Sequence, residues 1–302
     1  MILFDYLIFP GFLFSSFVGL LSSCLERKLT ARLQWRVGPP WYQNFMDVIK
    51  LIGKETIVPA GAKFTFLLAP YLGLLNLVLV SMILGKFIFP PMISFSGDII
   101  VILYLLIIPA IAVVMGALSS RNQLASLGAS REIKLVLGYE LPFILSVIAI
   151  IVRSQGAIKM GDILVHQADF GSNVFSLSGM LAFVVAVFCS QAKLGFVPFD
   201  ISEAEQEIMA GSLIEYSGLP LAVFKLNKAI LLYIMPLFLI ILFWAKGLSL
   251  PVLAVKYLAI LVIFILIKNT NPRLRIEQAV KFFWGPVTLL AFAAVILALL
   301  GK

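Results

Sequence analysis

Long apolar segments limit the possible folds of this chain more than any other feature. Eight stretches, each close to the roughly 20 residues that a membrane-spanning helix needs, are centred near Phe14, Leu75, Leu105, Leu145, Val185, Leu237, Ile260 and Ala291. The mean hydropathy is +1.08 and only 13% of residues are charged, against about a quarter in soluble domains. Without barrel-like alternation, these segments predict an all-α integral membrane protein, a single polytopic domain over residues 1–302. The first segment carries Asp5 and no basic leader, so we expect a retained helix.

Basic residues predict the orientation of these spans, because loops on the cytoplasmic side are enriched in Lys and Arg. Most of the 23 basic residues fall in alternate loops, beginning with the loop after the first span. The other side receives only Lys86, Arg153, Lys159, Lys246 and Lys302. We therefore predict a multi-pass protein of the cell membrane with both termini outside. Lys256 lies within the seventh span, and a snorkelling side chain is favoured over a role in transport.

The first inner loop, residues 26–63, has the pattern of a surface helix. Phe45, Val48, Ile49 and Ile52 recur at i, i+3, i+4 and i+7 and form one apolar stripe. Gly38-Pro39-Pro40 predicts a turn before this stripe and Pro59 a break after it. We expect an amphipathic helix over residues 43–53, lying along the membrane surface.

A second inner loop, residues 193–217, is strongly acidic. If Ser202 caps a short helix there, Glu203 and Glu205 fall in its first turn, where the macrodipole favours acids. Glu203 and Glu207 would share a face and repel each other, unless one is protonated or paired with a base such as Arg36 or Arg131. The macrodipole therefore explains some of these acids and not all of them.

Acids beside apolar segments are the candidates for function. An ionisable group inside the membrane costs roughly 2.5 to 3.5 kcal/mol on insertion scales, so such groups usually mark ion paths, docking sites or buried pairs. The candidates are Glu132, Glu140, Asp200, Glu203, Glu205, Glu207 and Glu215.

Several ordered motifs are specific enough to resemble a known family. They are Glu26-Arg27-Lys28, Arg36-Val37-Gly38-Pro39, Asp47-Val48-Ile49-Lys50-Leu51 with Lys54-Glu55, Gly128-Ala129-Ser130-Arg131, Tyr139-Glu140-Leu141-Pro142, Pro198-Phe199-Asp200 to Glu207, Glu215-Tyr216-Ser217-Gly218, and Pro272-Arg273-Leu274-Arg275. Together they resemble the H-type (subunit 1) membrane subunit of respiratory complex I and its relatives. The resemblance runs from about Glu26 to the last span.

Two departures from the quinone-reducing members are informative. Those members typically carry a longer segment between the arginine and the aspartate of the first loop, whereas Arg36 and Asp47 are only eleven positions apart here. After Tyr216-Ser217-Gly218 the chain reads Phe224-Lys225-Leu226-Asn227-Lys228 and lacks the usual Ala-Glu-Tyr. Both features look like the energy-converting membrane-bound nickel-iron hydrogenases or the related sulfane sulfur reductases, which puts a quinone site in doubt.

The resemblance implies a subunit between a cytoplasmic redox arm and an ion-pumping membrane arm. Its partners would be an iron-sulfur small subunit, a catalytic large subunit, antiporter-like membrane subunits and lipid, with no nucleic acid. Electrons would pass from ferredoxin to protons or sulfane sulfur through iron-sulfur clusters and a nickel-iron centre on partner subunits. No cofactor, catalytic residue or metal is expected in this chain, which has only the two separated cysteines Cys24 and Cys189.

The resemblance also assigns roles to the charged residues. Proton or sodium coupling would use Glu140, Glu203, Glu207 and Glu215, with Glu132 and Glu205 as further members. Glu140 is expected a turn or two after the start of the fourth span, and a salt-bridged end residue is the alternative. Countercharge and docking of the redox arm would use Arg36, Arg131, Asp47, Lys50, Lys54, Glu55, Asp200, Arg273 and Arg275. The ordinary excess of charge on an inner face remains an alternative for several of these.

Two other classes of function stay open. A free-standing secondary transporter would show inverted repeats with paired broken helices, and the two polar loops differ in sequence and charge. A passive scaffold would only anchor the redox arm. Ion pumping would then survive the substitution of Glu140 or Glu207 by Gln.

Overall fold

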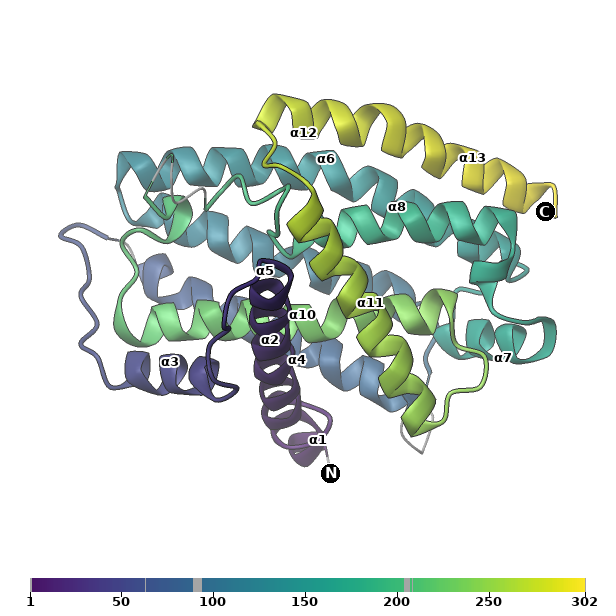
Figure 1. The fold of residues 1–302 in the computed structure, drawn as a ribbon, viewed down its shortest axis with the longest axis horizontal. Helices are drawn as coiled ribbons and strands as arrows, with labels where there is room; N and C mark the ends of the chain where they lie inside the picture. The colour runs from purple at the N-terminus through teal and green to yellow at the C-terminus, as the bar shows by residue number, and fades with distance from the viewer. Residues whose placement is uncertain (1, 63, 89–93, 204–206, 208, 302) are drawn as a thin grey trace.

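A computed structural model describes residues 2–62, 64–88, 94–203, 207 and 209–301, and this part of the chain is built from helices (Figure 1). The longer helices are α2 (Phe12–Leu33), α4 (Phe64–Ile88), α5 (Asp98–Ser119), α6 (Gln123–Arg153), α8 (Leu177–Lys193), α10 (Gly218–Phe243), α11 (Leu250–Thr270) and α13 (Thr288–Leu299). The shorter helices are α1 (Ile2–Leu7), α3 (Gln43–Ile52), α7 (Met160–Phe170), α12 (Ile276–Phe282) and the single turns η1 (Asn173–Phe175), η2 (Gly211–Leu213) and η3 (Phe283–Val287).

The expected all-α membrane architecture is confirmed. In the described residues, seven helical segments are long and apolar enough to cross a membrane, counting α1 with α2 and α12 with α13. The eighth predicted span, centred near Val185, is the apolar helix α8. Its 17 residues are slightly fewer than the roughly 20 that a perpendicular span needs. The side of the membrane on which the termini lie stays a prediction.

Helix α10 forms the centre of the bundle. Every residue from Ala229 to Phe243 is buried, and α2, α4, α8 and α11 all pack against this helix. Figure 1 shows α10 running through the middle of the molecule, with α2 and α11 crossing it at steep angles. A helix that is apolar on all sides is stable only when other helices surround it, so α10 serves as the common packing surface.

The far end of α10 is held by side chains of neighbouring segments. Gln167 Nε2 donates to the carbonyls of Ile241 and Leu242 at 3.0 Å each. Lys256 Nζ donates to the carbonyl oxygens of Trp244 at 2.9 Å and Lys246 at 2.7 Å. These donors satisfy carbonyls that a helix end leaves without partners. Lys256 is thus a capping residue near a helix end.

The last span is a single rod with one turn of π-helix. Helix α12 continues through η3 into α13, and Pro286 in η3 cannot donate a hydrogen bond to the preceding turn. Thr288 Oγ1 donates to the carbonyl of Phe283 at 2.6 Å inside this turn. Figure 1 shows the rod lying along α6 and α8.

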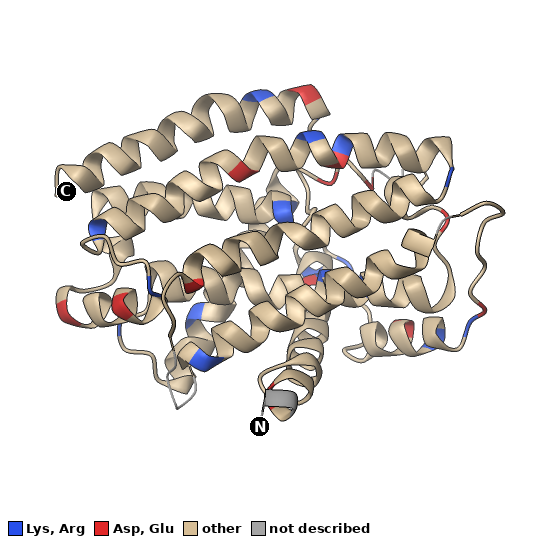
Figure 2. Ribbon diagram, turned by 180° about the vertical axis from the view of Figure 1, so that it is seen from behind, with Lys and Arg blue, Asp and Glu red and all other residues tan. Residues whose placement is uncertain are grey.

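The polar loops gather at one end of the bundle, which we call the inner end after the predicted orientation: residues 34–62, 120–122, 194–203, 209–217 and 271–275. Figure 2 shows how sparse charged residues are along the helices themselves. The predicted surface helix is present as α3, which packs on α2 and α10. Its stripe is divided: Phe45 and Val48 contact the core, whereas Ile49 and Ile52 remain exposed. The exposed pair suits a helix that also meets the membrane interface.

Candidate functional site

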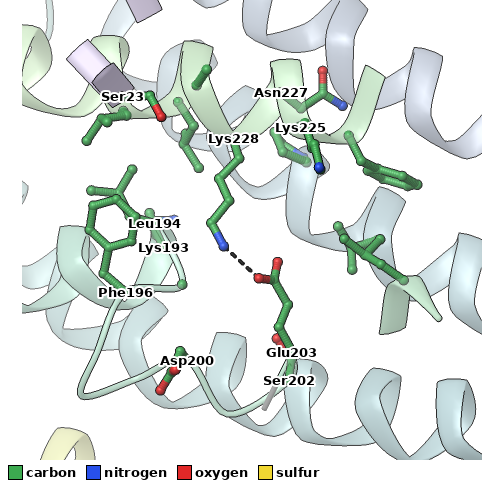
Figure 3. A pocket seen from close by; sticks show the side chains of 18 of the residues that line it. Ser23, Lys193, Leu194, Phe196, Asp200, Ser202, Glu203, Lys225, Asn227 and Lys228 are labelled. Atoms are coloured by element: carbon green, nitrogen blue, oxygen red, sulfur yellow. Dashed lines mark hydrogen bonds and ion pairs between the residues drawn. The ribbon is translucent and has the colours of Figure 1, made fainter. Parts of the chain in front are cut away.

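A polar cavity of about 810 Å³ opens at the inner end, between α2, α5, α6, α10 and the acidic loop. Figure 3 shows side chains from the loop and from α10 pointing into it. Its wall is partly apolar, with Leu106, Phe196 and Phe224 among the lining residues. Its charged lining residues are Glu26, Arg27, Asp47, Glu132, Lys193, Asp200, Glu203, Lys225, Lys228, Lys268 and Arg273.

The first ion pair of the cavity joins the acidic loop to the central helix. Lys228 Nζ on α10 lies 2.7 Å from Glu203 Oε2 (Figure 3). Glu132 on α6 also lines the cavity, where Ser202 donates a hydrogen bond to it and both Glu203 and Lys228 are close enough to influence its charge. Two carboxylates therefore lie near one ammonium, which is paired with Glu203, and the three groups come from α6, the loop and α10. A change in charge on one of them must alter the other two.

The second ion pair lies deeper. Lys193, the last residue of α8, places its Nζ 2.6 Å from Glu140 Oε2 on α6, and the lysine side chain is only 2% exposed. The ammonium also lies 4.9 Å from the ring centre of Tyr139 and 4.8 Å from that of Phe143. Glu140 Oε1 is buried, with no hydrogen-bond partner in the described structure. The pair is thus almost desolvated and only partly satisfied, which makes its free energy sensitive to nearby charge.

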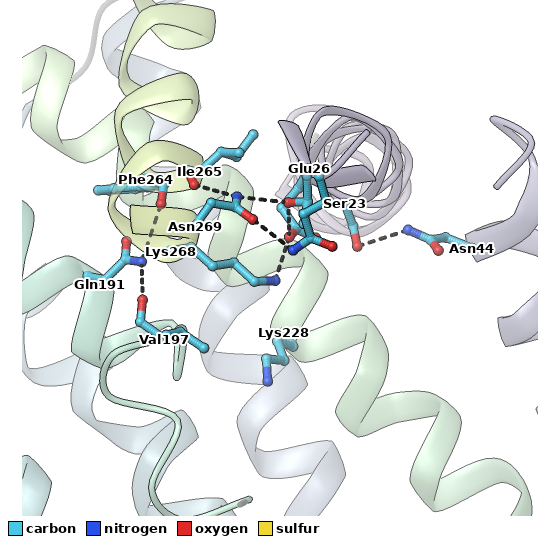
Figure 4. A network of polar contacts seen from close by, with 12 residues as sticks. Ser23, Glu26, Asn44, Gln191, Val197, Lys228, Phe264, Ile265, Lys268 and Asn269 are labelled. Carbon is cyan, nitrogen blue, oxygen red and sulfur yellow. Dashed lines mark hydrogen bonds and ion pairs between the residues drawn. The ribbon is translucent and has the colours of Figure 1, made fainter. Parts of the chain in front are cut away.

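A third pair ties α2 to α11 at the cavity wall. Lys268 Nζ lies 2.6 Å from Glu26 Oε1, and the same carboxylate oxygen accepts a hydrogen bond from Thr30 at 3.3 Å. Asn269 Nδ2 donates to Thr30 Oγ1 at 3.3 Å. Figure 4 shows these groups between the two helices, with Asn44 of α3 bonded to Ser23 on the other side of α2.

Two more pairs lie on the rim of the cavity. Arg273 Nη2 is 2.9 Å from Asp200 Oδ2 and joins the loop before α12 to the acidic loop. Arg27 Nη1 is 3.2 Å from Asp47 Oδ2 and joins α2 to α3. These pairs are more exposed than the Lys193 pair, so each contributes roughly 0 to 1 kcal/mol and mainly positions the segments.

Side chains from the same site donate hydrogen bonds to backbone carbonyls of α4 near Pro70. Pro70 cannot donate to the carbonyl of Phe66, and the hydroxyl of Tyr216 donates to that carbonyl instead, at 2.9 Å. Asn227 Nδ2 donates to the carbonyl of Pro70 at 2.9 Å. Burial raises the pKa of the Tyr216 phenol, so the hydroxyl keeps its proton and remains a donor. The acidic loop and α10 are thereby fixed to α4.

Several predicted residues are brought together here. Glu140 and Glu203 belong to ion pairs beside and in the cavity, and Glu132 lines the cavity. Arg131, one of the two predicted bases, pairs with Glu207 at 2.7 Å, although Glu207 is 62% exposed and lies outside the cavity. Glu215 accepts a hydrogen bond from Asn122 at the start of α6. Glu205 falls outside the described residues, as do 204, 206 and 208, so the predicted short helix after Ser202 is not described.

Other predicted residues are exposed at the inner end, where the structure gives them no ion pair within the described chain. They are Arg36, Lys50, Lys54, Glu55 and Arg275. Helix α6 begins at Gln123, about five turns before Glu140. This helix projects beyond the apolar segment, since 31 residues span about 46 Å against a hydrocarbon core of about 30 Å, so the place of Glu140 relative to the start of the membrane span stays a prediction.

The lysines of the site were not predicted. Arginines were expected as countercharges, whereas Glu140, Glu203 and Glu26 each pair with a lysine. Lys193 and Lys268 lie in the last turns of α8 and α11, where basic residues are common for reasons of orientation alone. The available signal was Lys228, which stands well inside an apolar segment and needed a partner.

The described residues hold no group of three His, Cys, Asp or Glu side chains that could bind a metal ion. Cys24 and Cys189 are both buried and free. The chemistry that this arrangement supports is the movement of protons or of charge between paired groups. A helical protein whose described residues include seven membrane-spanning segments and a cavity lined by Lys–Glu pairs at one end belongs to the class of multi-pass membrane proteins.

The comparisons with known proteins define this class more closely. Residues 7–299 match the NADH dehydrogenase family, and the chain belongs to the branch of that family formed by the H-type (subunit 1) proteins. The H subunit of NADH-quinone oxidoreductase from Anoxybacillus flavithermus is 32% identical over 297 residues, covering 92% of this chain and 87% of that protein. The corresponding protein from Dehalococcoides mccartyi is 34% identical, covering 86% of this chain and 76% of that protein.

Solved structures are also similar to this chain, and one of them is informative. A chain of the membrane-bound sulfane sulfur reductase, an archaeal respiratory membrane complex, superposes with a TM-score of 0.83 at 32% identity. The match covers 94% of this chain and 96% of that chain. These relatives are subunits of oxidoreductase complexes, so further subunits are expected around this chain.

Proposed function

We propose that this chain is the non-redox membrane subunit that couples electron transfer in a docked redox arm to ion translocation. The observation that carries the proposal is the pair of lysine–glutamate contacts, Lys228–Glu203 and Lys193–Glu140, at one inner cavity with Glu132 beside them. The relatives from NADH-quinone oxidoreductases and the sulfane sulfur reductase neighbour support an assignment within a respiratory complex.

The physical step is a change of charge near the cavity. A unit charge entering within about 8 Å of one of these groups changes its energy by about 2 kcal/mol at an effective dielectric constant of about 20. That energy shifts a protonation equilibrium by about thirtyfold. A proton then leaves or joins one group, and the change reaches the second pair through α6, where Glu132, beside the Lys228–Glu203 pair, stands two turns from Glu140.

The inner end offers a surface for the redox arm. Residues 34–62 expose Trp35 at 98%, Val37 at 92% and Trp41 at 65%, and the same segment exposes the charges Lys54 and Glu55. Exposed aromatic residues with a charged border are typical of protein interfaces. The iron-sulfur small subunit and the catalytic large subunit would dock there, and antiporter-like membrane subunits would pack along the sides of the bundle.

The terminal acceptor separates three versions of the proposal. The short first loop and the Phe224–Lys228 segment resemble the ferredoxin-linked hydrogenases, in which protons are reduced at a nickel-iron centre. The structural neighbour favours sulfane sulfur. The curated relatives and the partly apolar cavity of about 810 Å³ favour a quinone. Because the segment between Arg36 and Asp47 is short, as in the hydrogenases and sulfane sulfur reductases, we assign this chain to one of those two branches.

The test uses the complex purified through a tag on this chain, reconstituted in liposomes and supplied with reduced ferredoxin. Hydrogen, sulfide and quinol are measured together with ions moved per electron. We expect Glu140→Gln and Glu203→Gln to lower ion movement at least tenfold while at least half of the electron transfer remains. Asp169→Asn, an exposed acid of α7 far from the cavity, is the matched control.

The outcomes distinguish the competing functions. Full ion movement in both variants would show a passive scaffold and contradict the proposal. Purification of the chain without any partner would favour a free-standing transporter. Quinol formation without hydrogen or sulfide would keep the coupling role and correct the acceptor.

A further inference from the structure

A second hollow lies on the outer flank of the bundle, away from the polar cavity. It is a groove of about 460 Å³ between α6 and the rod formed by α12 and η3. Its lining residues are Lys134, Leu137, Ile276, Glu277, Val280, Lys281 and Trp284. The groove is therefore mainly apolar, with three charged residues.

The indole of Trp284 forms one wall of this groove. Its Nε1 donates to the carbonyl of Leu137 at 3.3 Å, so the ring is held between the two helices. The Trp284 and Leu137 side chains are nevertheless 61% and 63% exposed. Tryptophan with a satisfied N–H and an exposed ring face is typical of the membrane interface.

The depth of the groove follows from helix lengths. About 20 helical residues cross the hydrocarbon core. Counting back 20 residues from Arg153, at the outer end of α6, reaches Lys134. Counting back 19 residues from Leu299, at the end of α13, reaches Lys281. Both ammonium groups therefore belong at the inner boundary of the hydrocarbon, where lipid phosphates lie, and Leu137 and Trp284 lie about one turn deeper.

The charges of the groove have no partners within the described chain. Neither Lys134, Lys281 nor Glu277 makes an ion pair there, although Lys193, Lys228 and Lys268 each pair with a glutamate. Two lysines and one glutamate leave one net positive charge beside an apolar trough. This combination complements a molecule with an anionic head and an apolar chain.

We propose that this groove binds one anionic phospholipid. Its phosphate lies between Lys134 and Lys281, and one acyl chain runs along Leu137, Val280 and the indole of Trp284. Glu277 repels a negatively charged headgroup and cancels the attraction of one lysine. The remaining net positive charge should make the groove bind an anionic lipid about fivefold more tightly than a zwitterionic lipid.

The test places a photoreactive p-benzoylphenylalanine at Leu137 in the intact complex. The complex is reconstituted in nanodiscs with equal amounts of phosphatidylglycerol and phosphatidylcholine, irradiated and analysed by mass spectrometry. We expect phosphatidylglycerol adducts to exceed phosphatidylcholine adducts about fivefold. Lys134→Gln with Lys281→Gln should bring the ratio to one or below, and Glu277→Gln should raise it about another fivefold.

Two controls make the result decisive. Lys159→Gln with Lys246→Gln removes two exposed lysines at the other end of the bundle and should leave the ratio unchanged. The photoreactive residue at Leu289, which is 70% exposed on α13, should label both lipids equally. Equal labelling at position 137, an adduct with a polypeptide there, or no lipid adduct at 137 when 289 is labelled would each overturn the proposal.

Discussion

The buried pair of Lys193 and Glu140 gives the sharpest test of the site. Within the described residues, Lys193 is the one ion-pair partner of Glu140, whose side chain is 15% exposed, and replacing Lys193 by Met removes it. The other carboxylate oxygen, Oε1, already lacks a hydrogen-bond partner there. Removing one member of a buried pair costs about 3 to 5 kcal/mol. The loss of two aromatic contacts to the ammonium adds about 1 kcal/mol. We expect Lys193→Met to destabilise the protein by about 4 to 6 kcal/mol.

The reverse substitution should be milder. In Glu140→Gln the ammonium keeps the Tyr139 and Phe143 rings and can still donate to the amide oxygen. A cost of about 2 kcal/mol is therefore expected. The double variant leaves no unpaired charge and should cost about 2 kcal/mol as well, which gives a favourable coupling of about 4 to 6 kcal/mol.

The measurement is the free energy of unfolding of the purified protein in detergent, taken for both single variants and the double variant. Glu207→Gln serves as the control, since its pair with Arg131 is exposed and is worth at most about 1 kcal/mol. The reasoning is refuted if Lys193→Met costs no more than this control, or if the two substitutions are additive.

Further predictions concern the contacts that hold the site in place. Tyr216→Phe keeps the ring but leaves the Phe66 carbonyl without its donor, and should cost about 1 to 3 kcal/mol in the same unfolding assay. Gly19→Val should strongly reduce accumulation in the membrane, because a Cβ at Gly19 would lie 2.6 Å from the carbonyl oxygen of Ala229 where α2 crosses α10. Gly53→Ala, with no atom closer than 3.8 Å, should accumulate normally, and a blot of membrane fractions distinguishes the two.

The fold was largely predictable because the bilayer enforces it. Helix lengths near 20 residues and the apolar stripe of α3, with its period of 3.6 residues, are local properties. They can be predicted from the sequence of each segment without knowledge of its tertiary contacts. The start of α6 at Gln123 could not be predicted from local sequence. Its first turns pack against the acidic loop and lie outside the apolar segment, so no change in hydropathy marks Gln123.

The acids of the site were found more readily than the bases. An aspartate or glutamate beside an apolar span stands out, whereas a lysine at the inner end of a span is explained already by topology. The pairing of Lys193 with Glu140 depends on how α8 meets α6, at a separation of 53 residues in the sequence. No periodicity within one segment carries that information.

The two lysine–glutamate pairs differ in burial, and this difference predicts which pair an incoming charge reaches first. Lys228 and Glu203 are each 37% exposed, whereas Lys193 and Glu140 are 2% and 15% exposed. A charge arriving from the inner side therefore meets the solvated pair first, where screening is stronger and rearrangement costs less. The deeper pair is less screened, so the same displacement has a larger effect there. Glu132 stands beside the outer pair and Glu140 belongs to the deeper one, both on α6, so the proposed function makes α6 the element through which a change in the cavity reaches the deeper pair.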